Sequence, residues 1–277
     1  MGGRGGSSHR NTGGQQNAGL PLSLQYFAQK EAKDIQRLIA QAGLSASDVA
    51  YLQGQLARLI SENDPAMRVR RDYVELIIDS HFKNQMETGT SQGANAPDVR
   101  ARLSADYFGH PYDRATAVAA KEFEKYGYLA PRDKVAAMSN AGANFYGDVV
   151  FRFKRDAIMD RTTFKTADTL NTWYGHESAH AGWFKTASVS GLSELDHDTV
   201  RKVRAAERYI KDPDTWVDRV NFGEYFELQY HGSLSIKDVE SVTFGGTLPT
   251  NFPRVLEKLK RNGIKAYQVL RGRLYEL

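Results

Sequence analysis

The sequence predicts an α+β fold, in which a helical N-terminal region precedes a domain built on a mainly antiparallel β-sheet. Between residues 29 and 135, apolar residues recur every three or four positions, which is the period of an amphipathic helix. After residue 136 the period changes to two, most clearly in Tyr146–Lys154 and Glu224–His231, and this alternation is typical of strands. We therefore expect a helical region over residues 29–135 and an α+β domain over residues 136–277.

Composition excludes several classes of function. The chain has 277 residues, of which 41% are hydrophobic and none is cysteine. Disulfides, thiolate metal sites and a cysteine nucleophile are therefore excluded. No apolar run reaches the roughly 18 residues of a membrane span, so we expect no membrane partner. The net charge of +4 is spread along the chain, and nucleic-acid binding is not indicated.

The first 28 residues form two segments of contrasting composition. Residues 1–19 are mostly Gly, Ser, Asn and Gln, offer almost nothing to bury, and are predicted to be a disordered tail. Residues 20–28, LPLSLQYFA, form a short apolar motif. This motif either docks on the body of the protein or binds a partner.

Four helices are predicted in the region that follows. The first ends at Gly43, and the second begins after the capping residues at 45–48. The third covers residues 66–84, where the apolar residues have helical spacing. The fourth lies around Ala115–Tyr126, with Gly127 as its C-cap.

The second half is predicted to contain strands and one further helix. Tyr146–Lys154 alternates as a strand, with Val149, Phe151 and Phe153 on one side and Arg152 on the other. Asp198–Lys211 has the pattern of an amphipathic helix, and a last strand is expected around Ala266–Leu270.

The stretch from Phe222 to Phe244 carries the first candidate site. Alternation in its strand places Tyr225, Glu227 and Gln229 on one polar side. A carboxylate between a phenol and an amide is suited to chemistry in a cleft. A strand that simply faces solvent has the same pattern, so both interpretations stay open.

A second candidate is His176-Glu177-Ser-Ala-His180, which matches the zinc pattern H-E-x-x-H. On a helix the two histidines share one face and can bind Zn²⁺, with Glu177 as general base. Glycines bracket this stretch and no third ligand is evident, so zinc is possible but not favoured. The favoured interpretation is a loop with surface histidines.

A third candidate combines Arg152 with Thr162, Thr163 and Glu227, on segments expected to be successive strands. An arginine binds phosphate through two parallel hydrogen bonds, and hydroxyl groups position a ribose. A carboxylate stabilises the positive charge of an oxocarbenium-like centre.

The order of these segments resembles the arginine, Ser/Thr-rich strand and glutamate arrangement of ADP-ribosyltransferases. The similarity is to the toxin domains of phage-encoded and polymorphic-toxin proteins, and it lies in YGDVVFRFK, DRTTFKTADTL and YFELQYHGSLSIKDVESVTF. It implies a split β-sheet with NAD as substrate. Arg152 would hold the phosphates of NAD, Thr162 and Thr163 would stand on the Ser/Thr strand, and Glu227 would be catalytic, with Tyr225 and Gln229 beside it. Tyr225 departs from the Glu or Gln that the family often has there.

The start of the chain has its own resemblance, because MGGRGGSS and LPLSLQYFA are similar to the starts of prophage head-region proteins of Gram-positive bacteria. We therefore expect a phage-associated protein in the host cytoplasm or the virion, transferring ADP-ribose from NAD to a bacterial acceptor. Its N-terminal region would contact phage head proteins. The alternatives are a zinc metallopeptidase using His176, Glu177 and His180, and a non-enzymatic protein of the phage head.

Overall fold

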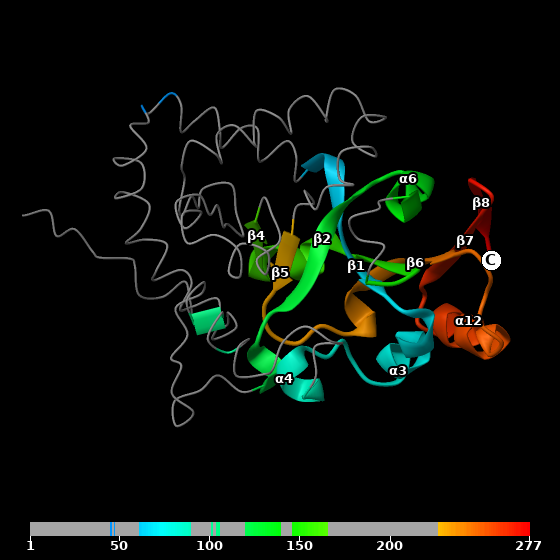
Figure 1. The fold of residues 1–277 in the computed structure, drawn as a ribbon, viewed down its shortest axis with the longest axis horizontal. Coiled ribbons are helices and arrows are strands. Elements are labelled where there is room, and N and C mark those ends of the chain that lie inside the picture. Colours follow the sequence, from blue (N-terminus) through cyan, green and yellow to red (C-terminus); the bar gives the residue numbers. More distant parts are fainter. Residues whose placement is uncertain are drawn as a thin grey trace, which may run out of the picture.

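The computed structural model describes residues 61–89, 120–139, 146–165 and 227–277, with five isolated positions between 45 and 105. Its centre is one eight-stranded sheet with the strand order β4-β5-β2-β1-β3-β6-β7-β8 (Figure 1). All neighbouring strands are antiparallel except β6 and β7, which are parallel. The strands are β1 (Asn63–Val69), β2 (Lys125–Pro131), β3 (Val149–Phe153), β4 (Thr162–Lys165), β5 (Glu227–Tyr230), β6 (Val239–Gly245), β7 (Lys265–Leu270) and β8 (Arg273–Glu276).

Helices lie on both faces of the sheet (Figure 1). Helix α12 packs through Phe252 against Phe244 of β6, and it also contacts α3. Helix α6 lies on the other face, where Lys134 sits over the ring of Tyr267. The α-helices are α3 (Val74–Asp79), α4 (Gln85–Thr88), α6 (Lys134–Ser139), α8 (Arg155–Ile158) and α12 (Phe252–Arg261), and the 3-10 helices are η2 (Arg71–Tyr73), η3 (Ala120–Glu122), η4 (Met159–Arg161) and η7 (Ile236–Asp238).

The predicted fold class is confirmed at the level of an α+β protein with a mainly antiparallel sheet. Strands were predicted at Tyr146–Lys154 and around Ala266–Leu270, and β3 and β7 occupy these positions. The described strands form one continuous sheet, whereas the family resemblance implies a split one. Strands β1 and β2 belong to this sheet, so it extends N-terminally beyond the expected boundary at residues 135 and 136.

The third predicted helix, over residues 66–84, is wrong in its first part. Residues up to Val69 belong to β1, and the α-helix begins only at Val74. Strand β1 lies between β2 and β3, and these two neighbours override its local preference. Pro65 is compatible with this central position because pairing with β3 starts only at Ala66.

The fourth predicted helix, around Ala115–Tyr126, is wrong at its C-terminal end. The structure has a single 3-10 turn at Ala120–Glu122, and Lys125–Pro131 is strand β2. Gly127, expected to cap a helix, lies inside this strand under the ring of Tyr230. A Cβ atom at Gly127 would lie 2.3 Å from the carbonyl oxygen of Ala66 and 2.5 Å from Cε2 of Tyr230. The close packing of β2 against Ala66 and the Tyr230 ring therefore requires a glycine at this position.

Substituting Gly127 with alanine is expected to lower the free energy of unfolding by about 3 kcal/mol, because the backbone of Ala66 and the buried ring of Tyr230 must move. Urea denaturation of both proteins measures this difference. Gly263→Ala is the matched control, since Gly263 has a φ of +70° but no atom near its missing Cβ. This control costs only backbone strain, about 1 kcal/mol. Equal losses in the two variants would contradict the packing explanation.

Aromatic rings fill the core on the face that carries α3 and α12. Phe82 makes edge-to-face contacts with Phe151 and Phe153 at centroid distances of 5.2 Å, and Phe153 makes one with Tyr230 at 5.1 Å. The hydroxyl of Tyr230 donates a hydrogen bond of 2.9 Å to the carbonyl oxygen of Ala66. Burial raises the pKa of Tyr230 well above its usual value, so its phenol stays a neutral donor.

Several sequence predictions lie outside the described residues. These are the disordered tail and the apolar motif of residues 1–28, the first helix, the body of the second, the HESAH stretch, the helix at Asp198–Lys211, and Tyr225.

Candidate functional site

One row of residues crosses the sheet and joins the two principal candidates. Arg152 of β3 pairs with Ala66, which pairs with Tyr128, and Tyr128 pairs with Glu227 of β5. Directly paired residues in antiparallel strands face the same side of a sheet. Arg152 and Glu227 therefore share one face, the face that carries α6. Three strand spacings separate their Cα atoms, a distance of roughly 14 Å.

Glu227 belongs to a buried hydrogen-bonded chain that joins β5 to β4. Gln229 Nε2 donates to Glu227 Oε1 at 2.6 Å, and Thr163 Oγ1 donates to Gln229 Oε1 at 2.8 Å. Thr163 Oγ1 also lies 2.9 Å from Nε2 of His231. All four side chains are at most 2% exposed. The predicted pairing of Glu227 with Gln229 is therefore present, and Thr163 supports the amide from the neighbouring strand.

The hydrogen bonds of this chain all run in one direction. The NH₂ group of Gln229 donates to Glu227, so the amide oxygen faces Thr163 and accepts from it. Thr163 has a single hydroxyl proton, which it donates to Gln229. It must then accept from His231, so Nε2 of His231 carries a proton. The network holds the Glu227 carboxylate in one orientation through three other side chains.

Thr162 and Thr163 lie on opposite faces, as neighbours in a strand must. The hydroxyl of Thr162 donates to the carbonyl oxygen of Ile158 at 2.7 Å and supports the turn before β4. Of the two threonines, only Thr163 shares a face of the sheet with Gln229 and forms a hydrogen bond to it.

Arg152 lies on the predicted face and has protein partners. Its Nη1 is 2.5 Å from Oδ2 of Asp64, and its Nη2 donates to the carbonyl oxygen of Pro131 at 2.6 Å. The side chain is 2% exposed, and Nε has no hydrogen-bond partner within the described part of the chain. A phosphate bound by Arg152 would have to compete with Asp64 for the guanidinium. The phosphate-binding role stays a prediction.

A second buried carboxylate stands beside the network, and the sequence analysis missed it. Glu124 is 4% exposed and accepts from Ser104 Oγ at 2.7 Å and from Tyr126 Oη at 2.9 Å. Tyr126 pairs with Gln229, so its side chain lies on the face of Glu227. Alternation of Glu124, Tyr126 and Tyr128 would have shown this face, had the segment been recognised as a strand rather than a helix.

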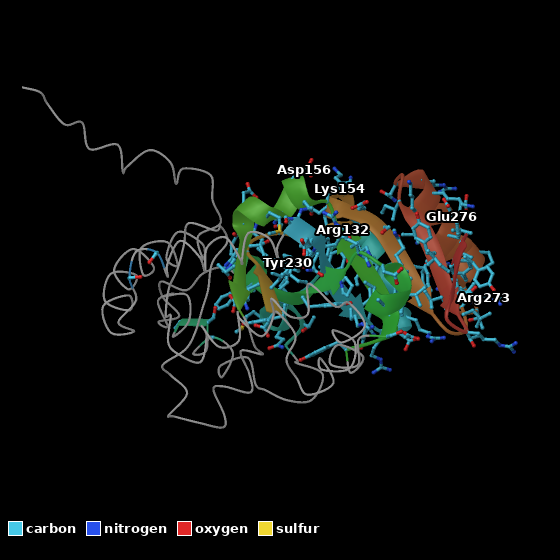
Figure 2. All side chains as sticks on the ribbon, turned by 90° about the horizontal axis from the view of Figure 1, so that it is seen from above. Arg132, Lys154, Asp156, Tyr230, Arg273 and Glu276 are labelled. Carbon is cyan, nitrogen blue, oxygen red and sulfur yellow. The ribbon has the colours of Figure 1, made fainter. Side chains whose placement is uncertain are left out.

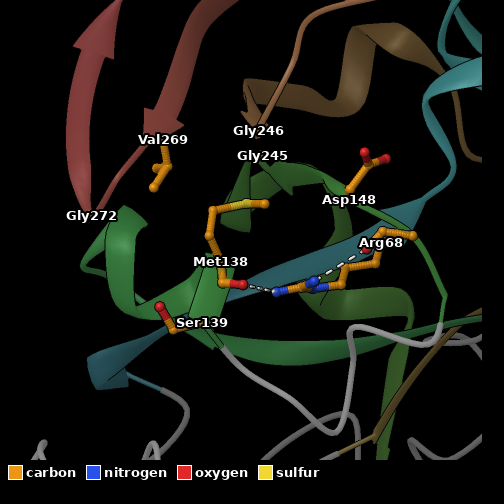
Figure 3. Close-up of a pocket in the computed structure, with 9 residues that line it drawn as sticks. Arg68, Met138, Ser139, Asp148, Gly245, Gly246, Val269 and Gly272 are labelled. Carbon is orange, nitrogen blue, oxygen red and sulfur yellow. Dashed lines mark hydrogen bonds between the residues drawn. The ribbon is translucent and has the colours of Figure 1, made fainter.

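Tyr128 stands between Glu227 and the arginines of the same face. Burial raises the pKa of its phenol, and the nearby charge of Arg68 opposes this. Arg68 Nε lies 3.4 Å from the Tyr128 hydroxyl, and its Nη2 donates to the carbonyl oxygen of Ala137. Nη2 also donates to the carbonyl oxygen of Met138 (Figure 3). A hollow of about 350 Å³ lies here, lined by Arg68, α6 residues and glycines of β6 and the β7–β8 turn. Arg68 therefore fastens the C-terminal end of α6 to the sheet.

Lys125, the first residue of β2, lies on the opposite face of the sheet and binds the turn that follows His231. It is 2% exposed, and its Nζ donates to the carbonyl oxygens of Lys121, Phe123 and Gly232 at 2.8, 3.2 and 2.9 Å. Burial lowers the pKa of Lys125 to about 8, and the charges of Glu87 and Glu124 only partly offset this.

Lys125 should make stability rise with pH in the alkaline range. Below pH 8 the amine is charged in both states, and the folded state bears the cost of its burial. Between pH 8 and about 10.5 the folded amine is neutral while the unfolded one still binds a proton, so folding becomes more favourable. Relative to Lys125→Met, the wild type should gain about 3 kcal/mol over this range. Urea denaturation at several pH values measures the difference, and a gap independent of pH would refute the assignment.

In the described ranges, no cluster of three metal-binding side chains occurs. The same ranges hold no helix with the length and apolar character needed to cross a membrane.

Comparison with known protein families and with curated proteins gives no match. Among solved structures, the chain is similar to DarT from Thermus sp. 2.9 in complex with NAD⁺. The identity is 10%, the TM-score is 0.37, and the match covers 73% of this chain and 90% of DarT. A likeness of this strength carries no weight for fold or function, and both rest on the residues described above.

Proposed function

We propose that the protein is an ADP-ribosyltransferase that uses NAD as its substrate and Glu227 as its catalytic carboxylate. The observation that supports this most is the buried chain from His231 through Thr163 and Gln229 to Glu227. A carboxylate held by an amide on one strand and a hydroxyl on the next is pre-organised for electrostatic stabilisation. The resemblance of the Arg152, Thr163 and Glu227 segments to the ADP-ribosyltransferase pattern agrees with this role.

The proposed chemistry follows from the charge of the reacting ribose. The bond between the nicotinamide nitrogen and ribose C1′ breaks, and nicotinamide leaves as a neutral molecule with the electron pair. C1′ then carries positive charge, which the Glu227 carboxylate stabilises and which a hydroxyl or amine of the acceptor attacks. The acceptor loses one proton, so charge and atoms balance. When water takes the place of the acceptor, the product is free ADP-ribose.

Neighbouring residues have distinct parts in this proposal. Gln229 and Thr163 orient the carboxylate. The alternation of the sequence predicts that Tyr225 shares its side of the strand. Arg152 holds the NAD phosphates and would exchange Asp64 for them in doing so. The acceptor is a bacterial protein or another bacterial macromolecule in the host cytoplasm, and the N-terminal region contacts phage head proteins when the protein is carried in the virion.

The test is release of nicotinamide from NAD⁺ by the purified full-length protein. One reaction contains water alone, and a second contains a bacterial extract with NAD⁺ labelled in the adenine. The proposal expects nicotinamide in the first reaction, the second or both, and labelled macromolecules in the second. Treatment of the labelled macromolecules with protease or with nuclease then shows whether the acceptor is a protein or a nucleic acid. If nicotinamide is released in neither reaction, the protein is not an NAD-consuming enzyme.

A further inference from the structure

The C-terminal segment from α12 to β8 carries a strong net positive charge, unlike the rest of the chain. Residues 252–277 hold seven basic and two acidic side chains, a net charge of +5. The whole chain has +4, so the remaining 251 residues together carry −1. Positive charge is thus concentrated at one end of the sheet, where Figure 1 places α12, β7 and β8.

Part of this charge is neutralised within the fold, and part is not. Arg254 and Lys258 form ion pairs with Glu75 of α3, and Arg261 pairs with Glu257. Among the described residues, the remaining four basic side chains have no ion-pair partner and are exposed: Lys260, Lys265, Arg271 and Arg273.

Strand β8 leaves one row of backbone groups open. The N–H of Leu277 donates to the carbonyl oxygen of Ala266 on β7 at 3.0 Å. In an antiparallel ladder successive residues point alternately to the two sides, so Arg273 and Tyr275 also bond to β7. Leu274 and Glu276 then direct their N–H and C=O groups away from the sheet. β8 is the last strand in the sheet order, so in the described sheet no strand pairs with these groups.

Side chains on this edge are well exposed and mixed in character. Leu274 is 43% and Tyr275 45% exposed, and Leu270 at the end of β7 is 41% exposed. Arg273 and Glu276 project at the same end of the molecule (Figure 2). Arg271 and Gly272 form the two-residue turn before β8 with φ angles of 52° and 71°, and this turn places a second arginine at the start of the edge.

We infer that the open edge of β8 binds an extended acidic peptide of a partner protein, which adds to the sheet as a ninth strand. Backbone groups of Leu274 and Glu276 supply the hydrogen bonds, and Arg271 and Arg273 select acidic side chains. A second copy of the chain fits less well, because pairing two β8 strands brings together two segments of charge +5. Nucleic acid and anionic lipid fit the charge but make no use of the backbone edge.

The test uses the full chain and a fluorescent peptide of alternating glutamate and valine, about six residues long as in a typical strand. Anisotropy measures its binding at low ionic strength and at about 0.15 M salt, where the attraction weakens. The wild type should bind this peptide, and a lysine–valine peptide of equal length should bind at least about tenfold more weakly. The double variant Arg271→Glu/Arg273→Glu should lose at least about tenfold in affinity. Glu276→Gln is the charge control and should bind as well as wild type or better.

Strand addition is separated from simple charge attraction by Leu274→Pro. This change removes one outward N–H and no charge, and it leaves the bonds of Arg273 and Tyr275 to β7 in place. Binding should fall at least about tenfold while circular dichroism stays unchanged. Should this variant not fold, Glu276→Pro removes the other outward N–H.

Three results would overturn the inference. The first is an acidic peptide that fails to bind the wild type. The second is unchanged binding in the folded proline variant. The third is tighter binding of single-stranded DNA or of phosphatidylserine vesicles than of the peptide.

Discussion

Glu227→Gln is expected to slow nicotinamide release from NAD⁺ by about 10²–10³-fold, the usual effect of losing one electrostatic contact to a transition state. Glutamine has nearly the same shape, and its oxygen can still accept from Gln229. Only the negative charge is lost, and that charge is what the developing cation on ribose C1′ requires. The measurement is initial rate under saturating NAD⁺, where the loss should appear in kcat.

The matched control is Glu240→Gln. Glu240 lies on β6, is exposed, and is remote from β5 in the strand order. Its substitution should leave the rate within a factor of about two, because an exposed distant charge is screened by water and salt. A Glu227→Gln protein that keeps the full rate would remove Glu227 from the mechanism. A variant that loses the rate together with its melting transition would show only that Glu227 supports folding, and Glu227→Asp would then be needed to separate the two roles.

Arg152→Met is expected to lower the free energy of unfolding by about 3 kcal/mol, since it removes the buried partner of the Asp64 carboxylate. Asp64 would keep only its longer contact with Arg132 Nε at 3.7 Å, and the carbonyl oxygen of Pro131 would lose its donor as well. Adding Asp64→Asn to this variant should restore part of the loss, because that carboxylate charge is then removed. Urea denaturation of the two single variants and the double variant measures the coupling.

The same variants separate structural support from phosphate binding by Arg152. Asp64→Asn leaves the guanidinium in place without its carboxylate, so NAD⁺ should bind at least as tightly as in wild type. Calorimetric titration with NAD⁺ measures this. If Asp64→Asn weakens NAD⁺ binding as much as Arg152→Met does, Arg152 acts by holding the β2–α6 turn, and the assignment of phosphate binding is wrong.

Local sequence patterns located the parts of the site that lie within one strand. The pairing of Glu227 with Gln229 follows from a period of two, as does the common face of Val149, Phe151 and Phe153. Contacts between strands were beyond such patterns, because a register cannot be read from one segment. Asp64 and Arg152 are 88 positions apart, and only the sheet order brings them together.

The errors in the helical region have a related cause. In Lys125–Pro131, Gly127 is read as the C-cap of the preceding helical pattern, and this hides the alternation of Glu124, Tyr126 and Tyr128. Gly127 illustrates the ambiguity, since a glycine is equally typical of a helix cap and of a close approach in a sheet. The ring of Tyr230, 103 positions later in the chain, decides between them.

The strand order also determines which strands can pair first while the chain is being synthesised. Among the described strands, β4 has β5 as its one neighbour, and β5 joins it to β2. Residues 166–226 must therefore be synthesised before either β4 or Glu227 can take its place, and contacts between residues so far apart in the sequence form slowly. β1, β2 and β3 can associate much earlier. A nascent chain halted before β5 would thus hold a paired sheet centre without a completed carboxylate network, so that any NAD-consuming activity is withheld until β5 has been synthesised and paired.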